Sequence, residues 1–171
     1  INLNSVIKAI KIRKTHNNIM KPGIGVGGYC LTKDPAFIEY SAFNLYNLKK
    51  SSFPLISKII PINNNSPSYI EDIIKNYLPS VKNLKVAILG ASYKEDVGDT
   101  RSSPSEKIYK KIKYISDLID VYDPIVKYWS EINISPKPLI KNLKKYDIVI
   151  IAVNNDYFKK INLTNLVSSK C

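Results

Sequence analysis

The sequence predicts an α/β fold in which a parallel sheet with helices is preceded by a mainly helical segment. Three short strand-like runs, at residues 85–89, 119–122 and 147–153, alternate with helical patterns in the second part of the chain. The third run, DIVIIAV, is apolar at every position after its aspartate, which is typical of a strand covered on both faces of a sheet. Because strands that alternate with helices form parallel sheets, we expect residues 67–171 to form a Rossmann-like unit.

Before this unit, two helical patterns flank a glycine-rich loop. Apolar side chains recur at helical spacing in residues 3–12 and again in residues 36–48. Asp34 and Pro35 precede the second pattern as a helix cap and a proline at the first helical position. Residues 51–66 contain two prolines and a cluster of asparagines, which predict breaks or a linker between the two parts of the chain.

Helix signals also separate the predicted strands of the second unit. Ser66 and Pro67 form a helix start, and an apolar stripe with the spacing of an amphipathic helix follows over residues 70–78. The sequence SPSE at residues 103–106 predicts a capping box with proline at the first helical position. We expect a last helix at residues 163–167, and the chain ends where a further strand of such a sheet is expected.

Composition indicates a globular protein from a reducing compartment. The chain has 171 residues, of which 44% are hydrophobic, and its 26 basic and 14 acidic side chains give a net charge of +12. All but two of the basic residues are lysines, scattered rather than clustered with arginines and aromatic side chains, so nucleic-acid binding is the least favoured function. Two cysteines provide no disulfide framework and no apolar run reaches membrane-spanning length, so we expect a cytoplasmic protein.

The loop KPGIGVGGYCLTKDP, residues 21–35, concentrates four glycines before one cysteine. Gly23, Gly25 and Gly28 match the G-x-G-x-x-G spacing of a dinucleotide-binding turn. Such a turn needs a strand before the glycines, a helix that starts within them and an acidic residue about twenty positions later. None of these accompanies the loop, and the segment GASYKED after the first predicted strand also lacks the pattern. Neither part of the chain therefore carries an intact dinucleotide fingerprint.

The alternative is a glycine cradle that presents Cys30. Glycines let backbone amides approach a ligand closely and hold a neighbouring side chain at a fixed angle. Lys33 and Asp34 follow one helical turn later, and an ammonium group together with a helix N-terminus favours the nucleophilic thiolate form of a cysteine. On spacing alone, a small buried cysteine in a glycine turn explains the sequence equally well.

Three sequence blocks decide between these alternatives. The run P-G-x-G-x-G-G-Y-C-L-x-K-D at residues 22–34 resembles the catalytic-cysteine motif of the UDP-glucose/GDP-mannose dehydrogenase family. LGASYKEDVGDTRSSPSE, residues 89–106, is similar to the start of that family's UDP-binding domain, and YDIVIIAVNNDYF, residues 146–158, resembles a third block. The resemblance implies that residues 1–66 are part of the central helical dimerisation domain with the catalytic-cysteine loop, and that residues 67–171 are the UDP-binding domain.

The resemblance also implies a reaction. Members of the family oxidise the C6 hydroxyl of a nucleotide sugar to a carboxylate with two molecules of NAD, so the chain resembles part of a UDP-glucose 6-dehydrogenase that serves polysaccharide precursor synthesis. Cys30 would trap the intermediate aldehyde as a thiohemiacetal, which is oxidised to a thioester and then hydrolysed. Asp34 would help to position the hydrolytic water.

Other motif positions match residues that would contact NAD or the substrate. Lys33 and Arg101 match positions near NAD. A solvated Lys33, and a salt bridge from Arg101 to Asp96 or Asp99, explain the same residues without a cofactor. The residues implied in substrate binding are Gly23, Gly25, Gly27, Tyr93, Lys94 and Arg13, the last of them toward substrate bound by another subunit.

The same resemblance sets expectations for the rest of the molecule. The family's N-terminal NAD-binding domain and its general-base lysine have no counterpart in these 171 residues, so we expect a fragment, truncated also at its end and inactive by itself. We expect a homodimer in the full-length enzyme, a UDP-sugar as substrate, and no metal, nucleic acid or membrane as partner. The alternative function is a non-catalytic UDP-sugar-binding or assembly module that acts with a separate NAD-domain chain.

Overall fold

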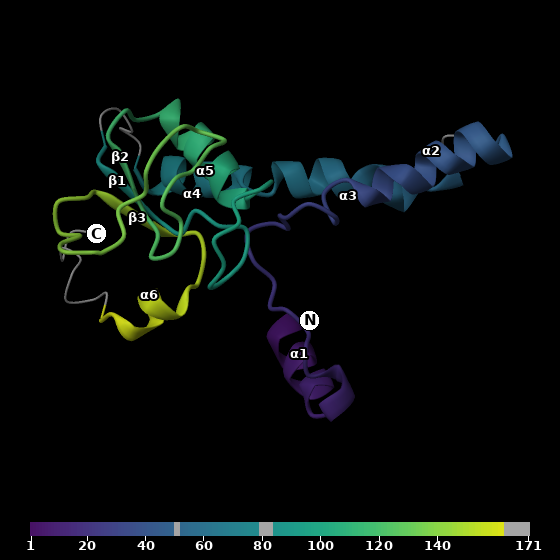
Figure 1. Ribbon diagram of the computed structural model, residues 1–171, viewed down its shortest axis with the longest axis horizontal. Coiled ribbons are helices and arrows are strands. Elements are labelled where there is room, and N and C mark those ends of the chain that lie inside the picture. The colour runs from purple at the N-terminus through teal and green to yellow at the C-terminus, as the bar shows by residue number, and fades with distance from the viewer. Residues whose placement is uncertain (50–51, 79–83, 163–171) are drawn as a thin grey trace.

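The computed structural model describes residues 1–49, 52–78 and 84–162, and the helix expected at residues 163–167 lies outside them. The elements form an α/β unit around a small parallel sheet, with further helices that extend away from it (Figure 1). The fold class predicted from the sequence is therefore confirmed.

The sheet consists of three parallel strands in the order β2-β1-β3. The strands are β1 (Val86–Leu89), β2 (Ile119–Tyr122) and β3 (Ile148–Ile151). All four side chains of β1 are buried, because a strand flanks it on each edge and packing covers both faces. In β3, by contrast, Ile151 is 50% exposed, so the burial on both faces expected for residues 147–153 holds only in part.

Helices α4 (Ser68–Tyr77) and α5 (Pro104–Lys113) cover one face of this sheet. Helix α6 (Asp156–Lys160) and residues 140–146 cover the other face with a second, smaller apolar core. The first core holds Ile74, Val86, Ile88, Ala91, Ile108, Ile112, Val121, Val126, Trp129 and Ile150, and the second holds Ala87, Leu89, Tyr122, Leu143, Tyr146 and Phe158. The chain therefore has the layered arrangement of helices and parallel strands that the alternating pattern predicts.

The remaining helices extend from the α/β unit. Helices α2 (Asp34–Tyr46) and α3 (Pro54–Asn65) lie side by side and form an arm that leads away from the sheet (Figure 1). Helix α1 (Leu3–Lys11) and the short 3-10 helix η1 (Lys14–His16) project separately from the rest of the chain. Most of the apolar side chains on these helices are exposed.

The structure corrects the linker expected at residues 51–66, because most of this segment is helix α3. Pro61 lies inside the helix, where its ring nitrogen cannot donate the hydrogen bond that the carbonyl of Ser57 normally accepts. Ser57 is exposed, so water can replace the missing donor. Pro54 occupies the first turn, where no such donor is needed. The two prolines are thus compatible with a helix that composition alone argues against.

Two helix starts differ in detail from the sequence prediction. Asp34 is the first residue of α2 rather than its cap, and the carbonyl of Cys30 accepts its N–H at 2.9 Å. At α5, the Ser103 hydroxyl accepts a first-turn N–H at 3.1 Å, as predicted. The Glu106 carboxylate does not return to the cap, because it pairs with Lys110 at 2.5 Å. Only one half of the predicted capping box therefore forms.

Gly90 follows β1 at a point where the packing leaves no room for a side chain. Its φ is +101°, and a Cβ atom there would lie 2.4 Å from the Cβ of Val153. We predict that Gly90→Ala lowers the free energy of unfolding by at least about 2 kcal/mol, since backbone strain and steric overlap add. Thermal unfolding should show a fall in Tm of about 4 °C or more. Gly23→Ala is the control, because nothing lies within 4 Å of its Cβ position. Equal Tm values for the two variants would contradict this packing.

Candidate active site

The glycine loop packs directly against the segment 93–104, which lies within the second sequence block. A Cβ atom on Gly27 would lie 2.6 Å from the Tyr93 Cβ and 2.7 Å from the Ser102 carbonyl oxygen, so only glycine fits there. The N–H of Gly28 donates to the Arg101 carbonyl at 2.9 Å. Two motifs that lie about seventy residues apart in the sequence are thereby brought into one site.

Helix α3 also holds this loop, through the side chain of Asn63. The Asn63 side chain accepts the N–H of Val26 at 2.7 Å and donates to the Val26 carbonyl at 2.7 Å. This pair of hydrogen bonds fixes the loop backbone one residue before Gly27. The sequence does not predict this role of Asn63, because a cluster of asparagines is typical of a linker and does not show which side-chain amide meets the loop.

Cys30 is exposed and lies just before α2. Beside it, the Lys33 ammonium group pairs with the Asp34 carboxylate at 2.6 Å and lies 4.7 Å from the ring centroids of both Tyr29 and Phe37. The hydrogen bond that the Lys33 ammonium group donates to the Asp34 carboxylate raises the pKa of Lys33. Lys33 is therefore a cation that side chains next to it in the sequence hold in place.

Arg101 makes a salt bridge to Asp99, one of the two partners that the sequence allows. Its guanidinium group binds the Asp99 carboxylate through two nitrogens, the closer at 2.6 Å, and lies 5.5 Å from the Tyr29 ring centroid. The hydrogen bonds from Arg101 lower the pKa of Asp99. The Arg101 side chain is still 62% exposed, and it faces the ring next to Cys30. The structural role and a ligand-binding role are therefore compatible.

The loop that carries Tyr93 and Lys94 is fixed by a buried asparagine. The Asn155 side chain is fully buried and accepts the N–H of Asp96 at 2.6 Å, while the Asp96 carboxylate accepts the N–H of Asp156 at 2.9 Å. These bonds hold Asp96 at a φ of +57°, which is unusual outside glycine. Lys94 itself is exposed. The sequence offered no signal for this role of Asn155, because the residue follows a strand as many loop asparagines do.

The other candidate residues differ in how near they lie to this contact. Gly25 packs against Asn63 and Pro104, each 3.4 Å from its Cβ position, whereas Gly23 has open space around it. Arg13 lies between α1 and η1, in the segment that projects away from the α/β unit (Figure 1). The structure thus brings together Gly27, Cys30, Tyr93 and Arg101, and it leaves Arg13 apart from them.

The α/β unit does not fit a dinucleotide in the usual way. In dinucleotide-binding folds of this kind, an acidic side chain binds the ribose. Here Asp123 follows β2, but it is only 1% exposed. Its carboxylate accepts the backbone N–H groups of Ala91, Ile125 and Val126 at 2.8 to 2.9 Å. The oxygens of Asp123 therefore close the turns after β1 and β2 and are not available to a ribose.

Comparison with known families places both parts of the chain. Residues 1–65 match the central domain of the UDP-glucose/GDP-mannose dehydrogenase family, and residues 87–170 match its UDP-binding domain. The chain belongs to this family. The two matches follow the same order as the glycine loop and the segment on which it is seated.

The chain is similar to several nucleotide-sugar dehydrogenases. A UDP-N-acetyl-D-mannosamine dehydrogenase from Methanococcus maripaludis is 32% identical over 92% of this chain, and a UDP-glucose 6-dehydrogenase from Bacillus subtilis is 32% identical over 66% of it. The solved UDP-D-ManNAc dehydrogenase of Pyrococcus horikoshii is 28% identical with a TM-score of 0.66, and the match covers 94% of this chain. The chain spans 35%, 25% and 37% of the length of these three proteins.

Metal-binding groups and membrane-spanning helices are both absent from the described ranges 1–49, 52–78 and 84–162. Within them, His, Cys, Asp and Glu side chains form no group of three or more that could hold a metal ion. None of the helices there has the length and apolar character needed to cross a membrane.

Gly27 provides a test of how the site is assembled. We predict that Gly27→Ala separates the glycine loop from residues 93–104 while the α/β unit stays folded, because the added methyl group would overlap a backbone carbonyl. The N–H of Gly28 should then exchange with solvent at least about tenfold faster in NMR hydrogen-exchange measurements. Gly23→Ala should leave this exchange rate unchanged. Equally slow exchange in both variants would show that the loop is not held by this contact.

Proposed function

We propose that this chain is the catalytic-cysteine and UDP-binding part of an NAD-dependent nucleotide-sugar 6-dehydrogenase. The observation that carries the proposal is the seating of the Cys30 loop on the segment 93–104 through two close-packed glycines. Around this contact lie a nucleophile, an exposed ammonium group at Lys94 and an exposed guanidinium group at Arg101. The names of the dehydrogenase relatives support the same assignment.

The proposed substrate is a UDP-sugar. The ammonium group of Lys94 supplies a compact positive charge for the diphosphate. The Tyr93 ring packs against Gly28, so its position is fixed relative to the cysteine loop. Gly23 and Gly25 carry no side chain that would keep a sugar away from the backbone. The relatives are named for UDP-N-acetyl-D-mannosamine and UDP-glucose, so the proposal covers UDP-hexoses and their N-acetylated amines as one class.

Cys30 is the proposed nucleophile. After the first oxidation, its thiolate adds to the carbonyl carbon of the C6 aldehyde and the oxygen takes a proton, which gives a thiohemiacetal. Loss of hydride from that carbon and of the hydroxyl proton gives a thioester, and attack by water releases the carboxylate and the thiolate. The exposure of Cys30 supports this role, because sugar and water must both reach the sulfur. Asp34, held by Lys33, is the proposed partner of the hydrolytic water.

NAD is the proposed acceptor of the hydride in both oxidations. Its binding site lies mainly outside this chain, because the carboxylate of Asp123 is occupied by backbone N–H groups. Arg101 is the group of this chain that fits the cofactor best, since an exposed guanidinium binds phosphate oxygens in pairs. The ammonium group of Lys33 is paired with Asp34. We therefore propose that Lys33 mainly holds the loop in shape and that its contact with NAD is secondary.

The arrangement in the complete enzyme follows from the same proposal. Residues 1–66 form part of a central domain, and residues 67–171 form the UDP-binding domain. The exposed apolar side chains of helix α2 support a homodimer. We place the enzyme in the cytoplasm, where it makes UDP-uronic acids as polysaccharide precursors. Arg13 is the proposed contact to substrate in the second subunit, since it lies away from the site of its own chain.

Lys94 provides a test of the substrate. We predict that the chain binds UDP in isothermal titration calorimetry, and that Lys94→Ala weakens binding at least about tenfold because a charge-assisted phosphate contact is lost. Lys127→Ala is the matched control, since Lys127 is an exposed lysine of the same unit outside the site. Equal loss of affinity in both variants would mean that UDP binding responds to net charge and not to a specific contact with Lys94. Absence of binding to a folded wild-type chain would contradict the assignment of this site.

Cys30 provides a test of the reaction. In a polypeptide that joins this chain to an NAD-binding domain of the family, we predict two NADH per UDP-sugar consumed. Cys30→Ala should lower carboxylate formation at least about a thousandfold, because no thioester can form. A variant that still forms the carboxylate at the wild-type rate would overturn the role of Cys30. Activity that appears only when the NAD domain is supplied as a separate chain would favour the alternative, an assembly module.

A further inference from the structure

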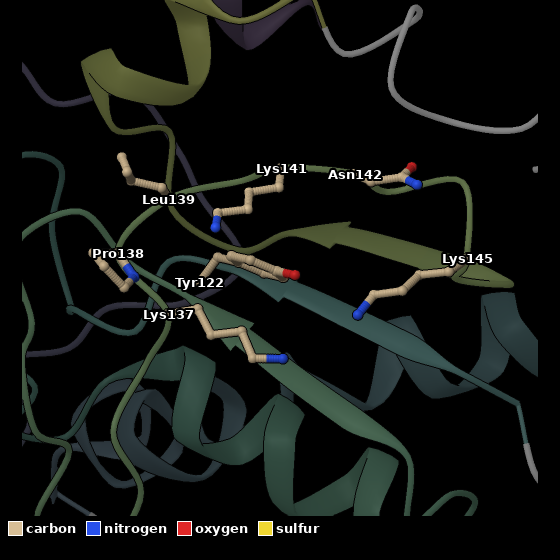
Figure 2. Close-up of a pocket in the computed structure, with 7 residues that line it drawn as sticks. All are labelled: Tyr122, Lys137, Pro138, Leu139, Lys141, Asn142 and Lys145. Atoms are coloured by element: carbon tan, nitrogen blue, oxygen red, sulfur yellow. The ribbon is translucent and has the colours of Figure 1, made fainter.

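A pocket at the β2 edge of the sheet involves none of the candidate active-site residues. Its volume is about 570 Å³, and it is lined by Tyr122, Pro138, Leu139 and three lysines, Lys137, Lys141 and Lys145 (Figure 2). In Figure 2 the three lysine side chains reach toward the space around the Tyr122 ring. They come from one segment of nine residues, at intervals of four. Three lysines that line one pocket indicate a binding site for a negatively charged ligand and not only a solvated surface.

The backbone holds these lysines in place. Lys137 lies alongside β2, where its N–H donates to the Val121 carbonyl at 2.8 Å and its carbonyl accepts another backbone N–H at 3.0 Å. At the other end of the segment, Leu143 and Tyr146 are buried in the second core on either side of Lys145. Two anchor points therefore restrict the segment before any ligand binds. Such preorganisation lowers the entropy that a ligand has to offset.

The pocket carries more positive charge than the protein itself neutralises. Lys137 and Lys145 share one carboxylate, that of Asp120, at 2.6 and 3.5 Å. Burial acts to raise the pKa of Asp120, but hydrogen bonds from Lys137 and Tyr146 outweigh it and lower the pKa, so the carboxylate stays charged. Lys141 makes no ion pair within the described part of the chain. Three ammonium groups against one carboxylate leave an excess of two positive charges.

We propose that this pocket binds the phosphate groups of a phosphorylated metabolite, with Lys141 and Lys145 as the principal ligands. An excess of two positive charges matches a phosphate dianion, and lysine ammonium groups bind phosphate as compact point charges. The volume of about 570 Å³ exceeds that of a phosphate group and admits an organic part beside it. Pro138 and the 57% exposed Leu139 offer apolar contacts to that part. This site is separate from the proposed UDP-sugar site and does not depend on it.

The test is a titration of the chain with inorganic pyrophosphate at low ionic strength, followed by calorimetry and by amide chemical shifts. It is carried out in a Lys94→Ala background, so that the proposed UDP-sugar site contributes little. Lys141→Ala should weaken pyrophosphate binding at least about tenfold, and Lys141→Arg should retain it. Lys144→Ala is the matched control, because it removes the same charge from the same segment without lining the pocket. It should change the affinity less than about twofold.

The outcomes separate this site from the proposed function and identify the source of the phosphate. Comparable affinities for pyrophosphate and UDP mean that the phosphate groups suffice, and tighter binding of UDP means that the apolar rim contributes; both support the site. Equal losses of affinity from Lys141→Ala and Lys144→Ala would mean that pyrophosphate binding depends on net charge alone, which would overturn the proposal. So would the absence of pyrophosphate binding, or sulfate binding as tightly as pyrophosphate. None of these results bears on UDP binding that depends on Lys94.

Discussion

The close contact between the glycine loop and the segment 93–104 is the constraint on which the candidate site depends. Gly27 lies so near the Tyr93 Cβ and the Ser102 carbonyl that no side chain fits between them. The hydrogen bond from Gly28 to the Arg101 carbonyl fixes the register of this contact. Cys30 follows only a few residues later, so its place relative to the α/β unit is set by backbone packing. The loop that carries Cys30 thereby contacts the segment that carries Lys94 and Arg101.

Two buried polar side chains of the α/β unit, Asn155 and Asp123, hold loops, whereas the cationic groups Lys94 and Arg101 are exposed. Asn155 fixes the loop that carries Lys94, and Asp123 closes the turns at the ends of β1 and β2. Buried polar groups that found no partner would cost free energy, so each of these hydrogen bonds also stabilises the fold. Loops at the carboxyl ends of parallel strands are common places for ligand binding. In this unit, fixed loops of that kind present Lys94 and Arg101 to solvent.

The distribution of charge separates the two proposed binding regions. Next to Cys30, Lys33 is paired with Asp34 and Arg101 with Asp99, so little net charge accumulates there. The pocket along β2 keeps an excess of ammonium groups over the one carboxylate of Asp120. A net charge of +12 for the chain is thus not spread evenly over its binding surfaces. Each region is suited to phosphate groups in its own way, the first through individual exposed cations and the second through a preorganised cluster.

The sequence by itself determined the order of the elements and the residues of the two main motifs. Alternation of strand and helix patterns specifies a parallel sheet, and the motif around Cys30 together with the block from 89 to 106 indicates the family. Helix α3 was not predicted, because Pro61 and the asparagine cluster argue against a helix and only the surrounding structure tolerates them. Local residue preferences thus predict the regular helices and strands, but they do not predict a helix such as α3 whose residues disfavour it.

Only the tertiary structure decided which side chains meet. The Asn63 side chain accepts the N–H of Val26 and the Asn155 side chain accepts the N–H of Asp96, which joins residues 37 and 59 positions apart, and no spacing rule connects such positions. The position of Asp123 after β2 is compatible with a contact to a ribose. In the structure, however, its carboxylate is buried and accepts backbone N–H groups. Lys137, Lys141 and Lys145 line one pocket because Leu143 and Tyr146, on either side of Lys145, are anchored in the second core. Hydrogen bonds and charge pairs act over a few ångströms in space, so their partners depend on how the elements pack and not on their order along the chain.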